Sequence, residues 1–149
     1  MELKEDYIIV NKYVVNLNFN VYTSPTKFVG EGNPLANQSH DLGFAVTFQE
    51  DTGLFYVDLI LKSDISIMEE KLYTIDITYR GIVVINNKLD DDAVKECLYV
   101  SVPSALYKSL QFLVEDVTNH SGYAPILLDE YTFKKEFNNV IGKNMRDLN

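Results

Sequence analysis

The residues best suited to chemistry in this sequence are two histidines, one cysteine and a run of aspartates. His40 and His120 lie far apart in the chain, and neither stands at a metal-ligand spacing from Cys97. Cys97 falls in a helical pattern, where packing is a commoner role for cysteine than nucleophilic attack. Residues 90–92, all aspartate, lack the alternating ligands and the glycine of a calcium loop. The sequence therefore predicts no metal site.

Other signatures of catalysis are missing from the sequence as well. The glycines are scattered, so no phosphate-binding loop of the Walker or dinucleotide type can be written, and there is no Gly-x-Ser-x-Gly elbow. Ser121 follows His120, but sequence neighbours do not establish the geometry that a nucleophile and its base require. The same holds for His40 and Asp41. We predict a protein that is not an enzyme and has no cofactor.

What remains is an excess of apolar and aromatic side chains. Phe44 and Phe48 share one parity with Leu42 and Val46. The segments that follow carry aromatic residues at both parities, namely Phe55, Tyr56, Tyr73 and Tyr79. A sheet covered on one face should not need apolar residues on both faces. Core packing accounts for many of these residues, and the surplus predicts either oligomer contacts or a groove for apolar segments of another protein.

The elements that must position these residues begin with four strand-like segments. Two-residue alternation predicts strands over 7–22, 42–49, 54–62 and 71–86. The segments between them are read as a stop at residues 24–25, an irregular loop at 30–39, a hairpin turn at 50–53 and a polar break at 63–70. In the first strand the alternation places on one face Tyr13, Val15, Leu17, Phe19 and Val21, with Val14 on the other.

After residue 87 the period becomes helical. Residues 89–92 resemble a helix start, with acidic side chains suited to the positive end of the helix dipole. Pro103 interrupts this helix and can open a second one, with Ser101 as its cap. The second helix is predicted from its apolar stripe, Leu106, Leu110, Leu113 and Val117, and ends at Gly122.

The end of the chain carries a last pair of elements. Residues 125–128 form a short apolar extended segment, and a final helix opens at Asp129 or Thr132 with Phe133 and Phe137 one turn apart. Residues 142–149 are polar and are expected to fray. Strands followed by helices predict an α+β fold, with a four-stranded antiparallel sheet and two or three helices packed on one face.

Composition and charge exclude further classes of function. The 149 residues fit a single domain over 1–149, and 46% hydrophobic residues are typical of a globular protein. A net charge of −9 has the wrong sign for binding nucleic acid through its phosphates. One cysteine and no apolar N-terminal run indicate the reducing cytoplasm. No stretch approaches the about 20 apolar residues of a membrane span, so membrane insertion is not expected.

Several local patterns, in the right order, resemble the SecB export chaperones. Residues 72–85 form an alternating strand in which Asp76 and Gly81 carry the similarity. The segment 97–106, with Cys-Leu-Tyr before Val-Pro, is similar to the family's approach to its helix-opening proline. Further matches are Gly122, Pro125, Leu127, Phe133 and Phe137. The resemblance covers roughly residues 13–139, but residues 129–132 depart from the family's proline-containing stretch and the first strand matches only in pattern.

The resemblance implies a homotetramer, built as a dimer of dimers, whose apolar grooves bind unfolded polypeptides without ATP. Asp76 is the one acidic residue it carries over as a contact to the SecA motor. The residues predicted to bind clients are Phe44, Val46, Phe48, Tyr56, Leu106 and Tyr107. Three hypotheses follow: a general holding chaperone for export, a chaperone dedicated to one client such as an antitoxin, and a domain that binds or converts a small molecule.

Overall fold

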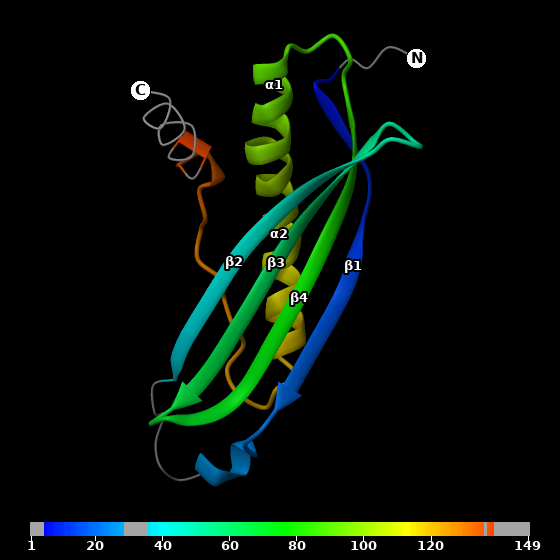
Figure 1. Cartoon of the computed structure of the whole chain (residues 1–149). Helices are drawn as coiled ribbons and strands as arrows, with labels where there is room; N and C mark the ends of the chain where they lie inside the picture. The colour runs from blue at the N-terminus through cyan, green and yellow to red at the C-terminus, as the bar shows by residue number, and fades with distance from the viewer. Residues whose placement is uncertain (1–4, 29–35, 136, 139–149) are drawn as a thin grey trace.

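The computed structural model describes residues 5–28, 36–135, 137 and 138, and it has two layers. A curved sheet forms one layer, and a long helix crosses behind it (Figure 1). The strands are β1 (Tyr7–Val21), β2 (Asn37–Gln49), β3 (Leu54–Ile67) and β4 (Glu70–Ile85). A 3-10 turn, η1 (Pro25–Phe28), follows β1. The sheet is antiparallel throughout, in the order β1-β4-β3-β2, so β1 and β2 are its edges and the predicted α+β fold class is confirmed.

The β2–β3 hairpin turns where the sequence predicts, but both of its strands are longer than expected. The N–H of Gly53 donates to the carbonyl of Gln49 at 2.8 Å, and Gly53 has a φ of +70°. β2 begins at Asn37, inside the predicted loop, and β3 runs on to Ile67 through the predicted polar break. The prediction of a polar break at residues 63–70 is wrong. Ser63 is polar but buried, and it lies on the same face of β3 as the buried Ile65 and Ile67, so the strand continues through it.

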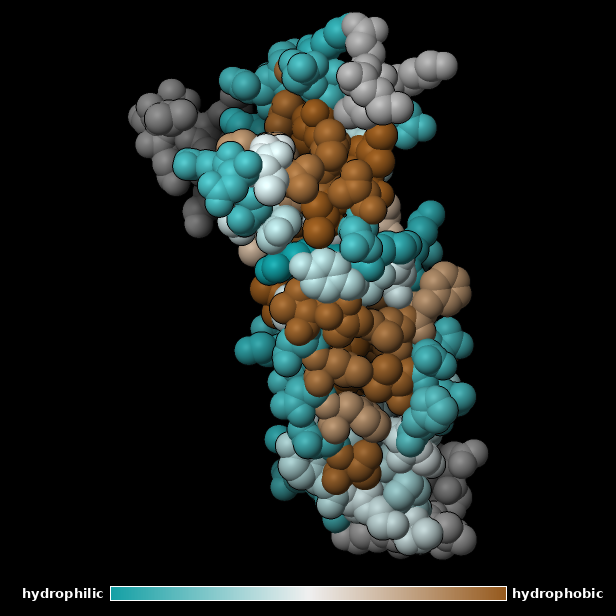
Figure 2. Space-filling view, turned by 90° about the vertical axis from the view of Figure 1, so that its right-hand side faces the viewer, coloured by the Kyte–Doolittle hydropathy of each residue, from teal (hydrophilic) through white to brown (hydrophobic). Residues whose placement is uncertain are grey.

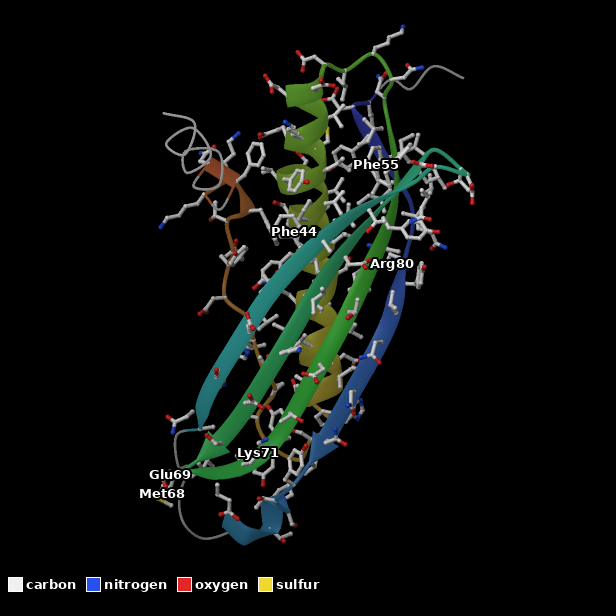
Figure 3. The ribbon with its side chains drawn as sticks, viewed as in Figure 1. Phe44, Phe55, Met68, Glu69, Lys71 and Arg80 are labelled. Carbon is white, nitrogen blue, oxygen red and sulfur yellow. The ribbon has the colours of Figure 1, made fainter. Side chains whose placement is uncertain are left out.

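The β3–β4 hairpin therefore closes with only two residues, Met68 and Glu69. Both have positive φ values, +47° and +68°, as a type I′ turn requires. The turn lies at the tip of the sheet, where Met68 leaves 77% of its surface exposed (Figure 3). Glycine and asparagine are the residues that adopt this geometry without cost, and neither is present.

Replacing this pair by Asn-Gly should stabilise the protein. We expect Met68→Asn/Glu69→Gly to raise the free energy of unfolding by about 1–2 kcal/mol, because the new residues tolerate positive φ. Urea unfolding would measure the change. Met68→Ala/Glu69→Ala is the matched control, since it removes the same side chains without relieving the backbone. An equal gain in both variants would show that the turn geometry is not the cause.

β1 does not keep the simple alternation that its sequence predicts. Its pairing with β4 shifts between Ile9 and Asn11 and again between Val14 and Asn16, which leaves one extra residue at each place. Tyr13 pairs with Arg80, whereas Val14 pairs with Tyr79. The second bulge thus puts Val14 on the same side as Leu17, and the prediction that Tyr13 shares a face with Leu17 is wrong.

The helical layer is one continuous run rather than two helices separated at Pro103. It consists of α1 (Asp91–Glu96), the π-turn η2 (Cys97–Ser101) and α2 (Val102–Thr118). Asp90 caps the start as predicted, accepting a 2.8 Å hydrogen bond from the N–H of Ala93. In η2 the N–H of Val102 donates to the carbonyl of Cys97, five residues back. Pro103 comes directly after this π-turn and has no N–H to donate. Because the regular helical hydrogen bonding is already interrupted there, the proline does not break the helix.

The core lies between α2 and the sheet face that this helix covers. Its fully buried side chains come from both layers and include Val57, Leu59, Ile75, Leu106, Leu110 and Val114. Gly81 lets the two layers approach closely, because a Cβ there would lie 2.9 Å from both terminal carbons of Leu106. This face of the sheet is called the inner face below, and the opposite one the outer face.

An extended segment returns along α2 after the helix ends. The Oγ1 of Thr118 donates to the carbonyl of Val114 at 2.7 Å and accepts from the N–H of Ile126 at 2.8 Å. Further along, Gln111 Nε2 donates to the carbonyl of Leu128 at 3.0 Å. Gly122 lies at the bend with a φ of +86°. Helical geometry resumes at residues 133–135, 137 and 138, here called the C-terminal turn, while the predicted frayed tail lies outside the described residues.

Candidate functional site

The inner face of β2 presents a row of apolar side chains toward the helical layer. Leu42, Phe44 and Val46 pair with buried residues of β3, and Phe48 pairs with Phe55. The ring centroids of Phe48 and Phe55 are 4.9 Å apart. Because β2 is an edge strand, this row is only partly covered, and Phe48 leaves 51% of its surface exposed. The predicted site residues on β2 therefore lie together on one accessible side.

Residues of the helical layer complete this row. The ring of Tyr99, in η2, lies edge-on to Phe44 with centroids 5.7 Å apart, and it stacks on Phe137 at 6.0 Å. Tyr99 is 37% exposed. We call Phe44, Phe48, Tyr99 and Phe137 the β2 aromatic surface. Figure 3 shows Phe44 projecting from β2 toward the helix and the C-terminal segment.

The other residues predicted to bind clients lie elsewhere. Tyr56 is on the outer face, where Arg80 covers its ring at 4.7 Å from the centroid. Leu106 has no exposed surface. Tyr107 is 8% exposed, and its hydroxyl donates to the carbonyl of Asp129 at 2.5 Å. A client would contact Leu106 or Tyr107 only if the core opened.

Tyr99 and Phe137 were missed as site residues. Both were visible in the sequence, Tyr99 within the helical pattern and Phe137 one turn after Phe133. Their spacing from β2 carries no signal in the sequence, because contacts across about 50 to 90 residues depend on tertiary packing. The exposure of Tyr99 and the π-turn that carries it are known only from the structure.

Asp76, the predicted SecA contact, lies half-buried on the outer face. In the sheet register it is opposite Lys62 on β3 and Asn18 on β1. Its nearest cross-strand neighbours are therefore one cation and one neutral amide. Asp41 of β2 is in turn opposite Lys62, so this row of the outer face alternates in charge.

A bidentate ion pair between Arg80 and Asp58 lies on the same outer face. Arg80 Nε and Nη2 donate to the two carboxylate oxygens of Asp58 at 2.7 and 2.9 Å. The hydrogen bonds to Asp58 raise the pKa of Arg80 above its usual range. Figure 3 shows Arg80 on the side of the sheet away from the helix. The pair joins directly opposite residues of β3 and β4, and it leaves this arginine little capacity to bind another anion.

The titratable groups that the structure describes near the site do not form a catalytic or metal-binding arrangement. Burial, with Asp6 and Glu96 nearby, raises the pKa of the Cys97 thiol, which disfavours the thiolate that a nucleophile needs. His40 Nδ1 lies 2.7 Å from Ser63 Oγ. Among the described residues, no three histidine, cysteine, aspartate or glutamate side chains are grouped so that they could hold a metal ion.

Partial burial lowers the pKa of His40, and the charge of Asp129 opposes this only in part. The unfolded chain, with an ordinary histidine pKa of about 6.5, then binds a proton more readily than the folded one. Stability should therefore fall as the pH drops below about 6.5. Urea unfolding at about pH 7.5 and 5.5 would show a smaller loss for His40→Gln than for the parent. His120→Gln, at an exposed position, is the control, and an equal change there would contradict the assignment.

Comparisons with known proteins agree on one family. Residues 2–143 match the family model described as preprotein translocase subunit SecB. The protein-export protein SecB of Ehrlichia ruminantium is 26% identical, with 91% of each chain covered. That of Caulobacter sp. is 26% identical, covering 84% of this chain and 74% of its own. Among solved structures, the SecB-like chaperone of Mycobacterium tuberculosis in complex with a peptide from the HigA1 antitoxin has a TM-score of 0.69 at 15% identity, covering 85% of this chain and 91% of its own.

Proposed function

This chain belongs to the SecB family, and from that premise we propose that it is an ATP-independent holding chaperone for unfolded or precursor polypeptides. The observation that carries the proposal is the β2 aromatic surface, where Phe48 and Tyr99 remain exposed beside an edge strand. Aromatic side chains give large contact areas, and an edge strand offers unpaired backbone groups to an extended segment. Neither depends on a particular client sequence. The chain acts in the cytoplasm by binding alone.

The direct test is suppression of aggregation of a chemically unfolded client at stoichiometric amounts of chaperone. Phe48→Ser should weaken client binding about 5- to 30-fold, because exposed aromatic residues dominate such contacts. Phe112→Ser is the matched control, since Phe112 is 74% exposed on the helix side away from the sheet. An equal loss in both variants would place the client elsewhere. A parent protein that neither binds the client nor delays its aggregation would refute the proposal.

The proposal includes a homotetramer built as a dimer of dimers. Of the large apolar side chains exposed in the described residues, most lie on β1 or just after it: Ile8, Val10, Tyr13, Val14, Val15, Leu17, Val21 and Tyr22. Figure 2, which views the molecule from the β1 side, shows a broad apolar surface interrupted by a polar band. A long apolar edge strand is a template for pairing with another chain, which supports contact between copies here.

Leu17→Lys should reduce the mass of the particle in solution. Leu17 is 44% exposed on β1, and a lysine at a sheet edge opposes pairing through its charge. Light scattering after size exclusion would measure the mass. Met68→Lys introduces the same charge at an exposed apolar position of the β3–β4 tip, away from β1. A monomeric parent would rule out this part of the proposal.

A chaperone dedicated to one client, such as an antitoxin, is the second candidate. The feature that favours it is the setting of Asp76 between Lys62 and Asn18, which leaves little net negative charge for a basic site on the SecA motor. Delivery to SecA is part of the first candidate. Affinity purification from the native cell would recover many precursor proteins in the first case and one protein in the second.

A SecA contact at Asp76 has its own test. Asp76→Asn should weaken binding of SecA if that carboxylate contributes. Asp64→Asn is the matched control, since the pairing of β3 with β4 places Asp64 one step along the same outer face. An unchanged SecA affinity in the Asp76 variant would favour the dedicated client.

A further inference from the structure

Lys12 is the one charged residue among the 15 of β1. It is paired with Gly81 in the sheet register, which places its side chain on the inner face. Its Nζ donates to the Oγ of Ser109 on α2 at 2.8 Å. Val10 and Val14, to either side along the strand, leave 53% and 38% of their surfaces exposed. The ammonium group therefore lies within the apolar surface of β1, on the side of the molecule where Figure 2 shows a polar band between two apolar areas.

Asp116 carries the opposite charge on the same side of α2. It follows Ser109 by seven residues, which is two helical turns, so both side chains lie on one side of the helix. That side faces β1, because Lys12 reaches Ser109 there. Asp116 is exposed. Among the described residues no side chain forms an ion pair with Asp116, and the ammonium group of Lys12 meets no carboxylate.

Two copies that pair through β1 would bring these two charges together. A contact between identical chains usually has two-fold symmetry, so the two strands run antiparallel and every contact occurs twice. Val14 is the central residue of β1, and pairing about it uses the whole strand. Lys12 comes two residues before this centre. Asp116 is about 10 Å further along α2 than Ser109, which corresponds to about three strand residues and so to a level just after the centre. Symmetry about Val14 thus places Lys12 of one copy at the level of Asp116 of the other.

Covering the β1 surface creates a need for this pairing. A charge that is enclosed by apolar side chains is unfavourable unless an opposite charge and hydrogen bonds accompany it. The ammonium group of Lys12 has three N–H donors, so it can keep its bond to Ser109 and still donate to a carboxylate. A foreign apolar strand without a carboxylate at this level would leave the charge enclosed and unpaired.

We propose that Lys12 and Asp116 form reciprocal ion pairs between two copies across the β1 contact, and that these pairs select a second copy of this chain over other apolar strands. The inference rests on the association between copies proposed above. Because the symmetric contact contains the pair twice, a single substitution changes both pairs. The charges therefore decide which chains associate, while the surrounding apolar residues supply the contact area.

Complementary charge reversal tests whether the two residues meet. Lys12→Glu alone and Asp116→Lys alone each oppose like charges, so each should weaken association about tenfold or more and lower the mass in light scattering. Mixing the two variants should restore the mass, with equal numbers of each chain, because both pairs are then attractive. A misfolded variant could not be rescued in this way. Lys108→Glu and Glu115→Lys are the controls, since both positions line a hollow of α2 beside Leu128 and should keep the mass of the parent.

The double variant Lys12→Glu/Asp116→Lys tests selection. It should associate with itself as the parent does, because its pairs are attractive again. Native mass spectrometry of a mixture with isotope-labelled parent should then find assemblies with even numbers of each chain only. Free mixing would refute the selection of partners.

The remaining outcomes separate this inference from the proposed association. Single variants that keep the mass of the parent, controls that dissociate equally, or a mixture that stays dissociated would overturn the ion pairs while the β1 contact stands. A monomeric parent would remove both the association and the pairs. The holding function would still be judged by its own aggregation assay.

Discussion

Leu106→Ala should lower the free energy of unfolding by about 2–5 kcal/mol. Leu106 has no exposed surface, and both of its terminal carbons pack against Gly81 of the sheet. Truncation removes buried apolar contacts and leaves a cavity, because the backbone on both sides is held by regular hydrogen bonding and cannot collapse fully. Few single substitutions in this chain should cost more.

Lys108→Ala is the control for this substitution, since Lys108 is exposed on the same helix. It should change stability by no more than about 0.5 kcal/mol. Urea unfolding at matched protomer concentration is the measurement, because association between copies would add to the apparent stability. The affinity of the folded Leu106 variant for a client should equal that of the parent. A lost affinity with unchanged stability would instead place Leu106 in the client groove.

Thr118→Val should cost about 1–3 kcal/mol, although it preserves the shape of the side chain. Thr118 is fully buried, and its hydroxyl connects the carbonyl of Val114 to the N–H of Ile126. Valine would leave that buried N–H without a partner, and the loss of its hydrogen bond is the expected cost. The extended segment that leads to the C-terminal turn should loosen first.

Thr118→Ser keeps the hydroxyl and loses only a methyl group, so it should retain most of the stability that valine loses. Hydrogen exchange at Ile126 would report the local effect, and urea unfolding the global one. Equal stability of the valine variant and the parent would show that this hydrogen bond is replaceable.

The strands show how much of the sheet can be predicted from the alternation of apolar and polar residues. Residues 54–62 and 71–86 were predicted because apolar and polar side chains alternate there. Periodicity did not predict that β3 continues to Ile67, since Ser63 interrupts the apolar set while occupying a buried position. A short polar side chain is tolerated there because it reaches a partner, the ring of His40 on the neighbouring strand.

Bulges and turns were harder to predict than strands. The extra residue near Val15 reverses which side chains of β1 face the helix. The residue types around Val15 give no signal of this bulge. The turn at Met68 and Glu69 carries neither glycine nor asparagine, so its sequence gives no hairpin signal. In both places the pairing of whole strands overrides local preference.

By itself the sequence determined the four strands, the helical start at Asp90, the α+β class and the resemblance to SecB, because these follow from local periodicity, capping and short patterns. It also brought Phe44, Val46 and Phe48 to one side of β2. Only the tertiary structure decided that Leu106 and Tyr107 are buried, that Tyr56 lies on the outer face, and that Tyr99 and Phe137 complete the aromatic surface. The reason is physical: whether an apolar residue is core or surface depends on what packs against it, and that partner lies far away in the sequence.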